Sequence, residues 1–323
     1  MQKGNDQMKT MATVCVTYNR KELLLRNIKS QLSQTFVPNR IFIIDNASTD
    51  GTFDYLKEQG ILDKENIVYC NTGSNLGGAG GFCFGIKKAC EYDADLICLM
   101  DDDGYPYNKD CFYNVINNLT DDKFKNPLFI NSVVVYNEND LTFPRDELKT
   151  IDDLKNEFAS NFCEGYVSPF NGTFINKKLV QLIGYPREEF FLRYDEADYY
   201  YKAKNKGVYM GTILNSVYYH PNTVNKRETK IILGLQFNNE YEAGWKEYYK
   251  VRNNYRIQIE NGASSLTIYL KYIKYVLGLY IFKIEDKKNI KQFIKFGYKD
   301  AINNKLGKRV QPGQKNMRKE RIQ

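Results

Sequence analysis

The sequence predicts an α/β protein built around an open, twisted and largely parallel sheet. Apolar β-branched runs alternate with amphipathic stretches from the N-terminal region to Asp103, which is the pattern of βαβ units. Polar residues also follow three of these runs directly: Thr17 and Asn19, Asp45 and Asn46, and Asp101 to Asp103. Ligands bind beyond the carboxyl ends of the strands in such sheets, so we expect these residues to line one crevice.

The elements of this pattern follow one another without a Gly/Ser linker. Strands are expected where Val, Ile, Leu and Cys predominate: 12–19, 40–46, 65–71 and 95–103. Between them, helical spacing or turn residues predict these segments: a helix at 20–34, a turn with a short helix at 49–60, and a helix at 82–93. Two later segments are expected to be strands, 128–137 and 172–179, and a helix is expected at 194–207. The rest of the chain, about the last hundred residues, is expected to be mostly helical. We expect two parts, 1–225 and 226–323.

Cysteine usage bears on the compartment. The seven cysteines are scattered and form no CxxC pair, which favours a reducing compartment and argues against zinc. Residues Met1 to Lys9 lack the apolar core of a signal peptide. We therefore expect a cytoplasmic protein.

Charge is distributed unevenly along the chain. From Asn261 to Gln323 there are 15 Lys and Arg against 4 Asp and Glu, a net charge of +11, whereas the rest carries 31 against 35, a net charge of −4. Such a tail favours an anionic membrane face or nucleic acid. No nucleic-acid-binding motif accompanies it, so we expect no nucleic acid partner.

The acidic run Asp101–Asp103 is the strongest candidate for chemistry. Adjacent carboxylates raise one another's pKa unless a cation lies among them, and Mg²⁺ or Mn²⁺ with substrate phosphates would relieve that repulsion. Asp101 and Asp103 share one face of an extended chain, which makes them the natural pair for nucleotide and metal. The alternative is a solvated acidic turn.

Three weaker signals accompany this run. The glycines of Asn75–Gly81 could let backbone N–H groups approach a phosphate, or could form a plain turn. His220, the single histidine, could complete a metal site, although a lone histidine is more often structural. Asp195, Glu196 and Asp198 begin a predicted helix, where acids favour the helix dipole; the functional alternative is a general base.

Taken together, these segments resemble the family 2 glycosyltransferases of the GT-A fold. The resemblance runs from about Thr13 to His220 and rests on six segments in the family's order: VTYNRKELL, IIDNASTDGT, NTGSNLGGAGGFCFGI, LMDDDGYP, FNGTFI and GYPREEFFLRYDEADYYYKAKNKG. It implies a Rossmann-like sheet with helices on both faces, followed here by a helical C-terminal extension.

The resemblance also implies a role for individual residues. The donor site would comprise residues from four segments: Thr17, Asn19, Arg20, Asp45, Asn75, Gly77, Gly78, Asp101 and Asp102. Asp101, Asp103 and His220 would bind Mn²⁺ or Mg²⁺. In the family's Glu/Asp-Asp motif the second acid is the catalytic base; here Asp195 takes the first position and Glu196 the second, where the family usually has Asp.

The subgroup implied is that of bacterial galactofuranosyl- and rhamnosyltransferases, because NLGGAGG, the Asp-Asp-Asp run and WKEYYKVRNNYRI (Trp245–Ile257) resemble theirs. These hexosyltransferases are inverting and extend cell-surface glycans, so a UDP- or dTDP-sugar and a lipid-linked or glycan acceptor are the expected partners. The alternatives are a catalytically inactive scaffold of this fold at the membrane and a sugar nucleotidyltransferase.

The segment Ser264–Phe282 is apolar but interrupted by Lys271 and Lys274. Two lysines within the segment make a transmembrane span unfavourable by several kcal/mol, so an amphipathic helix in the membrane interface is expected. The protein would then lie peripherally at the inner face of the cell membrane. The alternatives are packing on the catalytic domain and a contact within a homo-oligomer.

Overall fold

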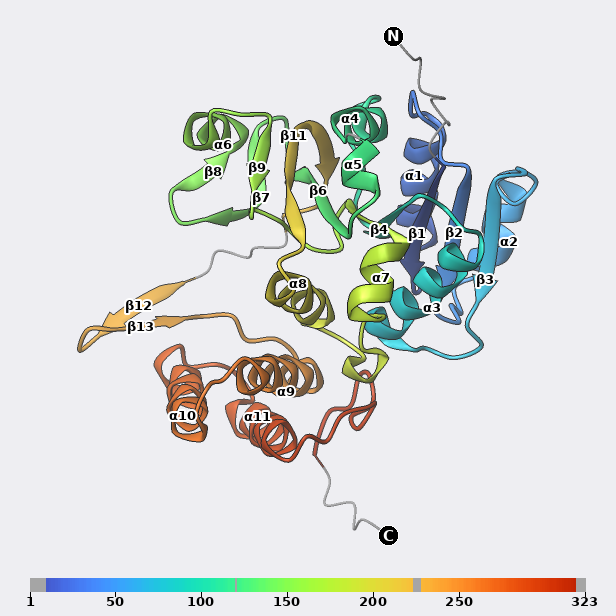
Figure 1. Cartoon of the computed structure of the whole chain (residues 1–323). Coiled ribbons are helices and arrows are strands. Elements are labelled where there is room, and N and C mark those ends of the chain that lie inside the picture. Colours follow the sequence, from blue (N-terminus) through green and yellow to red (C-terminus); the bar gives the residue numbers. More distant parts are fainter. Residues whose placement is uncertain (1–9, 120, 223–227, 318–323) are drawn as a thin grey trace. The chain divides into compact units, whose positions relative to one another are not determined.

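A computed structural model describes residues 10–119, 121–222 and 228–317 (Figure 1). The chain forms two compact units, the first comprising 1–186 and 199–222 and the second 187–198 and 223–323. The expected boundary between residues 225 and 226, and the N-terminal residues Met1 to Lys9, lie outside the described residues. Within the described ranges, no helix combines the length and apolarity that a membrane crossing needs.

The first unit contains one large mixed sheet. Its main path runs β3-β2-β1-β4-β10-β6-β11-β5. Strands β3, β2, β1 and β4 are neighbours in this order and are parallel (Figure 1). The strands have these bounds: β1 Met11–Thr17, β2 Arg40–Asp45, β3 Ile67–Asn71, β4 Leu96–Asp101, β5 Tyr105–Pro106, β6 Leu128–Val135, β7 Asp140–Arg145, β8 Leu148–Thr150, β9 Phe162–Glu164, β10 Thr173–Ile175 and β11 Tyr209–Tyr219. The predicted parallel half is therefore confirmed, and β10 adds an antiparallel strand between β4 and β6.

Helices cover both faces of this sheet, as expected. Their bounds are α1 Lys21–Leu32, α2 Thr52–Glu58, α3 Gly77–Glu91, α4 Cys111–Asn118, α5 Asp121–Phe124, α6 Ile151–Phe158, α7 Lys177–Ile183 and α8 Asp195–Asn205, the last of which begins in the second unit. Alternate residues of β1 serve the two faces: Met11 and Cys15 pack with α1, α2 and α4, whereas Ala12 and Val14 pack with α3, α7 and α8.

Helix α3 begins earlier than expected, at Gly77 rather than Phe82. The reason is packing, because a Cβ at Gly85 would come within 2.3 Å of Val14 Cγ1 and one at Gly81 within 2.6 Å of Val16 Cγ1. These two glycines let α3 lie directly against the sheet, and the helical conformation continues back through the glycine-rich run.

Besides the start of α8, the described residues of the second unit form a two-stranded hairpin and three helices. Their bounds are β12 Thr229–Ile232, β13 Leu235–Asn238, α9 Gly244–Glu260, α10 Ser265–Ile281 and α11 Lys287–Ile302 (Figure 1). A short 3₁₀ turn, η1 (Glu188–Phe190), also belongs to this unit. Helices α9, α10 and α11 share a core that includes Val251, Ile268 and Ile294.

Candidate active site

The acidic turn lies where the buried strand β4 ends. Asp101 is the last residue of β4, and Asp102 and Asp103 form the turn that follows. Asp102 is 3% exposed and accepts hydrogen bonds from Thr17 Oγ1 (2.8 Å) and Arg20 Nη1 (3.1 Å). The same Nη1 lies 3.0 Å from Asp103 Oδ2. Arg20 and Thr17 therefore connect the end of β1 to the acidic turn.

Burial and charge act against each other at Asp102. Burial raises its pKa to about 6, although Arg20 and the hydrogen bond from Thr17 act to lower it. At Arg20, burial acts to lower the pKa, but Asp102 and Asp103 outweigh it and raise the pKa. The guanidinium thus compensates for crowded carboxylates on the side of the turn that faces β1.

On its other side the turn meets His220. Asp101, Asp103 and His220 each offer one ligand atom, and these atoms all lie within 4.8 Å of one another. His220 Nε2 is 3.5 Å from Asp103 Oδ1, a buried oxygen without a hydrogen-bond partner. The structure thus brings together three residues from two segments that lie more than a hundred positions apart in the sequence.

The protonation of His220 suits a metal ligand. Its Nδ1 lies 2.9 Å from the carbonyl oxygen of Pro221; a carbonyl only accepts, so Nδ1 carries the proton and the lone pair is on Nε2. Burial lowers the pKa of His220, and Asp103 opposes this effect. Two carboxylates, one of them with an unpaired buried oxygen, and a neutral imidazole fit a small divalent cation such as Mn²⁺ or Mg²⁺.

Two residues of α1 that sequence reasoning missed support the acidic turn. Asn27, fully buried, donates from Nδ2 to the carbonyl oxygens of Gly104 (2.6 Å) and Asp101 (3.2 Å). Arg26 donates to the carbonyl oxygen of Asp103 (3.2 Å) and lies over the ring of Tyr105. The only signal in the sequence was a buried polar position within an amphipathic helix, which predicts a hydrogen-bond partner without naming it.

The predicted donor residues Asn19 and Asp45 lie at the ends of β1 and β2 and are linked through Ser48. Ser48 Oγ accepts from the backbone N–H of Asn19 (2.9 Å), and the backbone N–H of Ser48 donates to Asp45 Oδ1 (2.8 Å). The other carboxylate oxygen of Asp45 accepts from the hydroxyl of Tyr69, whose pKa is raised mainly by burial. Asp45 is thus buried and held in one orientation.

The glycine-rich run divides into two parts. Asn75 Oδ1 accepts from the backbone N–H of Gly77 (2.8 Å), and Gly77 has a φ of 71°, in the left-handed region that favours glycine. Around Gly78 a Cβ would meet no atom within 4 Å. Space for a ligand is therefore available beside Gly78, while the later glycines serve packing against the sheet.

The acids Asp195 and Glu196 begin α8 in the second unit. Asp195 is buried and Glu196 is half-buried. The residues just before them have unusual backbones: Phe191, Arg193 and Tyr194 have φ values of 62°, 66° and 66°. Non-glycine residues in this region cost about 1–3 kcal/mol each and cluster at functional sites.

Buried Arg252 and Asn253 of α9 hold this strained segment in place. Asn253 Nδ2 lies within hydrogen-bond distance of the carbonyl oxygens of Phe190 (3.0 Å), Leu192 (2.9 Å) and Arg193 (2.8 Å). Arg252 Nη2 donates to the carbonyl oxygens of Glu189 (3.1 Å) and Phe190 (2.9 Å). Both residues are fully buried. Their role in holding the segment before α8 was not predicted from the sequence.

Asp198, the third acid of this segment, forms an ion pair. Its Oδ2 lies 3.3 Å from Arg187 Nε, and Arg187 also pairs with Glu260 at 2.5 Å. This pairing gives Asp198 a structural role.

Comparison with solved structures supports the fold. The chain aligns with the mannosyltransferase PcManGT from Pyrobaculum calidifontis in complex with GDP-Man and Mn²⁺ at a TM-score of 0.55 and 11% identity, covering 93% of this chain and 89% of that one. It aligns with S. aureus TarS 1–349 at a TM-score of 0.54 and 14% identity, covering 91% and 81%. The expected GT-A fold is confirmed.

Sequence comparison identifies the family. The chain is 30% identical over 254 residues to galactofuranosyltransferase GlfT1 of Mycolicibacterium smegmatis, covering 75% of this chain and 81% of that protein. It is 29% identical over 262 residues to GlfT1 of Mycobacterium tuberculosis, covering 78% and 83%. The family model "Glycosyl transferase family 2" matches residues 13–184. The chain therefore belongs to glycosyl transferase family 2 and is a glycosyltransferase that uses a nucleotide-linked sugar donor.

Proposed function

We propose that this glycosyltransferase moves a single sugar, with inversion and with help from a divalent metal, onto a lipid-linked or cell-surface glycan. Galactofuranose, rhamnose or a similar sugar fits the subgroup, and the galactofuranosyltransferase relatives favour galactofuranose, with UDP ahead of dTDP as the nucleotide. The observation that carries the proposal is the cluster of Asp101, Asp103 and His220 with its unpaired buried oxygen.

The proposed metal ligands are Asp101, Asp103 and His220. When bound there, Mn²⁺ or Mg²⁺ supplies positive charge for the diphosphate leaving group. Arg20 keeps Asp102 and Asp103 oriented through its two ion pairs. The proposed donor-binding residues are Thr17, Asn19, Arg20, Asp45, Asn75, Gly77, Gly78 and the acids Asp101 and Asp102.

Glu196 is the proposed catalytic base, with Asp195 beside it. In a single displacement the acceptor oxygen bonds to the anomeric carbon while the bond from that carbon to the diphosphate oxygen breaks. Glu196 takes the acceptor's hydroxyl proton, and the leaving diphosphate keeps the electron pair. No covalent enzyme intermediate forms, so the configuration at the anomeric carbon inverts.

We further propose that the second unit associates with the inner face of the cell membrane. The turn of hairpin β12–β13 supports this, because Leu233 at its tip is 98% exposed with a φ of 50°. Such turns favour Asn or Gly, and a leucine in the left-handed region costs about 1–2 kcal/mol. Burial in the bilayer would offset that cost, and Ile231, 73% exposed, lies beside it.

A thermal-shift panel tests the catalytic proposal. Wild type, Asp103→Ala and the exposed control Asp63→Ala would be melted with UDP, dTDP and GDP, each with and without Mn²⁺. A ligand at 100 times its Kd adds about 2.7 kcal/mol, enough to raise the melting temperature by a few degrees. We expect a Mn²⁺-dependent shift with one nucleotide, lost only in Asp103→Ala. No shift with any nucleotide would contradict the proposed metal-dependent donor site.

A further inference from the structure

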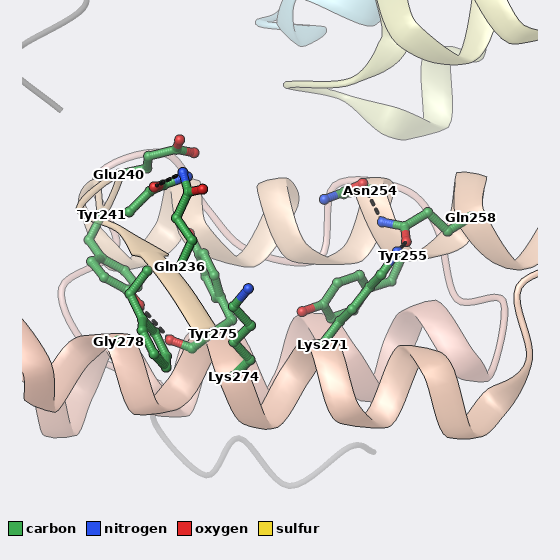
Figure 2. Close-up of a pocket in the computed structure, with 12 residues that line it drawn as sticks. Gln236, Glu240, Tyr241, Asn254, Tyr255, Gln258, Lys271, Lys274, Tyr275 and Gly278 are labelled. Atoms are coloured by element: carbon green, nitrogen blue, oxygen red, sulfur yellow. Dashed lines mark hydrogen bonds between the residues drawn. The ribbon is translucent and has the colours of Figure 1, made fainter. Parts of the chain in front are cut away.

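The second unit contains a pocket of about 230 Å³ that the proposed catalytic chemistry does not use. It lies among β13, the segment before α9, α9 itself and α10, and Figure 2 shows its lining side chains. Pockets for whole drug-sized ligands measure about 300–1,000 Å³. This pocket therefore suits a small headgroup better than a complete sugar nucleotide.

The polar groups at the floor of the pocket are hydrogen-bonded to one another. The Tyr241 hydroxyl donates to the carbonyl oxygen of Tyr275 (2.5 Å), and the Tyr275 hydroxyl donates to buried Glu247 (2.7 Å). Tyr241 can lie this close to α10 because residue 278 is glycine: a Cβ there would be 2.2 Å from the Tyr241 hydroxyl oxygen. Because its polar groups are already paired with one another, the floor holds its shape without a ligand.

Two lysines of α10 line the pocket. Lys271 donates to Gln258 Oε1 (Figure 2). Lys274 Nζ lies 5.7 Å from the centre of the Phe237 ring. Among the described residues, no carboxylate is within ion-pair distance of either ammonium, although Glu240 also lines the pocket. Two ammonium groups less than one helical turn apart, with amide donors nearby, match a multivalent anion such as phosphate.

The same helix has an unpaired apolar face next to these lysines. Leu266, Leu270 and Leu277 are 66%, 58% and 50% exposed. At 3.6 residues per turn, the three leucines lie within about 40° of one another around the helix axis. Measured from the middle of this leucine face, Lys274 lies about 60° and Lys271 about 120° around the same axis. The order around α10 is therefore apolar face, lysines, pocket.

This order matches the layers of a membrane surface. An interfacial helix buries its apolar face at the boundary of the acyl chains and keeps its lysines at the level of the phosphates. We propose that the pocket among β13, α9 and α10 binds the phosphate or diphosphate group of a membrane lipid, with Lys271 and Lys274 as its cationic partners. The proposal rests on the membrane association proposed above and on no step of sugar transfer.

The test compares two double variants of the full chain that remove the same charge. Lys271→Gln/Lys274→Gln removes the pocket lysines, and Lys295→Gln/Lys299→Gln removes two exposed lysines of α11. Each protein is sedimented with vesicles of phosphatidylcholine containing either a polyprenyl diphosphate or phosphatidylglycerol at equal surface charge. Melting curves monitor the fold of each variant.

We expect wild type to bind diphosphate vesicles more tightly than phosphatidylglycerol vesicles. The pocket pair should weaken diphosphate-vesicle binding about thirtyfold, since each lysine near an anionic surface contributes about 1 kcal/mol, and the control pair should keep the preference for diphosphate. Measurable binding that is equal for both vesicles, or equal losses in the two double variants, would overturn the proposal in favour of general charge attraction.

Calorimetry with inorganic diphosphate separates the headgroup from the lipid. EDTA is present so that metal-dependent binding at the proposed donor site does not contribute. Wild-type heat that disappears in the pocket pair supports the pocket even if no vesicle binds, in which case the membrane association alone fails. Diphosphate binding that survives in the pocket pair overturns the proposal. A dimer that Leu270→Asp dissociates, without change in vesicle binding, would identify the apolar face as a contact between copies and also overturn it.

Discussion

The acidic turn of the first unit and the acidic start of α8 in the second unit are supported in different ways. Asp101–Asp103 follow a buried strand, and their supports Thr17, Arg20 and Asn27 come from β1 and the helix after it. Asp195 and Glu196 follow three residues with positive φ, and that segment is fixed by residues of α9 about sixty positions away.

The two segments differ in the kind of unfavourable energy that their neighbours must offset. At the acidic turn the main problem is electrostatic, and Arg20 offsets part of it through two ion pairs. Before α8 the main problem is conformational, and it is met by hydrogen bonds from Arg252 and Asn253 to backbone carbonyl groups. The first arrangement should be sensitive to charge and metal, and the second to hydrogen-bond geometry.

Replacing Glu196 by Gln should have the largest effect on the second arrangement. Loss of a general base costs about 10²–10⁴ in rate, so we expect kcat to fall about a thousandfold. The thermal shift with nucleotide and Mn²⁺ should persist, because the proposed donor residues are unchanged. Glu196→Asp, one methylene shorter, should recover part of the rate. Near wild-type transfer by Glu196→Gln would show that another group takes the proton.

Asn253→Asp keeps the side-chain shape but removes the donors that hold the strained segment. A displacement of about 1 Å at a catalytic group can cost a hundredfold, so kcat should fall about that much while the KM for the donor stays the same. Asn303→Asp, an exposed residue whose amide bonds only the local carbonyl of Lys299, is the control. If activity falls only in proportion to lost folded protein, Asn253 stabilises the fold without positioning Glu196.

The same contrast explains how far sequence reasoning reached. The parallel half of the sheet was predictable because each strand and helix has its own periodicity, and the Asp101–Asp103 turn because its residues are adjacent. A strand was expected within 172–179, where β10 lies, but its antiparallel pairing was not predictable, because its partners β4 and β6 are far from it in the sequence. The roles of Arg252 and Asn253 were likewise not predictable, because the sequence shows only two polar residues in a helix and their partners are backbone carbonyls distant in the sequence.

A smaller effect is expected at the hairpin, away from both acidic sites. Leu233→Asp should reduce sedimentation with anionic vesicles about tenfold, because it replaces an apolar tip with a charge in the interface. Transfer to a water-soluble acceptor should be unchanged. Leu233→Asn is the matched variant: it suits the positive φ and should stabilise the turn while still weakening vesicle binding. Unchanged sedimentation of both variants would remove the hairpin from the membrane contact.

The smallest predicted effect compares the buried acids of the two units. Asp102 has Arg20 as an ion-pair partner at 3.1 Å, and Glu247 has Lys250 at 3.6 Å. The two oxygens of Glu247 also accept from neutral groups, the N–H of Glu242 (2.8 Å) and the hydroxyl of Tyr275 (2.7 Å). Burial raises the pKa of Glu247, with Lys250 opposing it. Between the ordinary glutamate pKa and this raised value, the native state holds a proton that the unfolded chain releases. The contribution of Glu247 to stability therefore falls as pH rises through that window.

The side chain of Glu247→Gln does not titrate, so the free energy of unfolding of this variant should not decrease with pH through this window. The difference between variant and wild type should grow with pH by about 1.4 kcal/mol for each unit by which the pKa is raised. Melting curves from pH 4 to pH 8, as a rough range that spans the titration of carboxyl groups, would measure it, with exposed Glu285→Gln as the control. A difference that stays constant with pH would mean that Glu247 keeps its charge when buried, held by Lys250 as Asp102 is held by Arg20, and the two units would then manage buried acids in the same way.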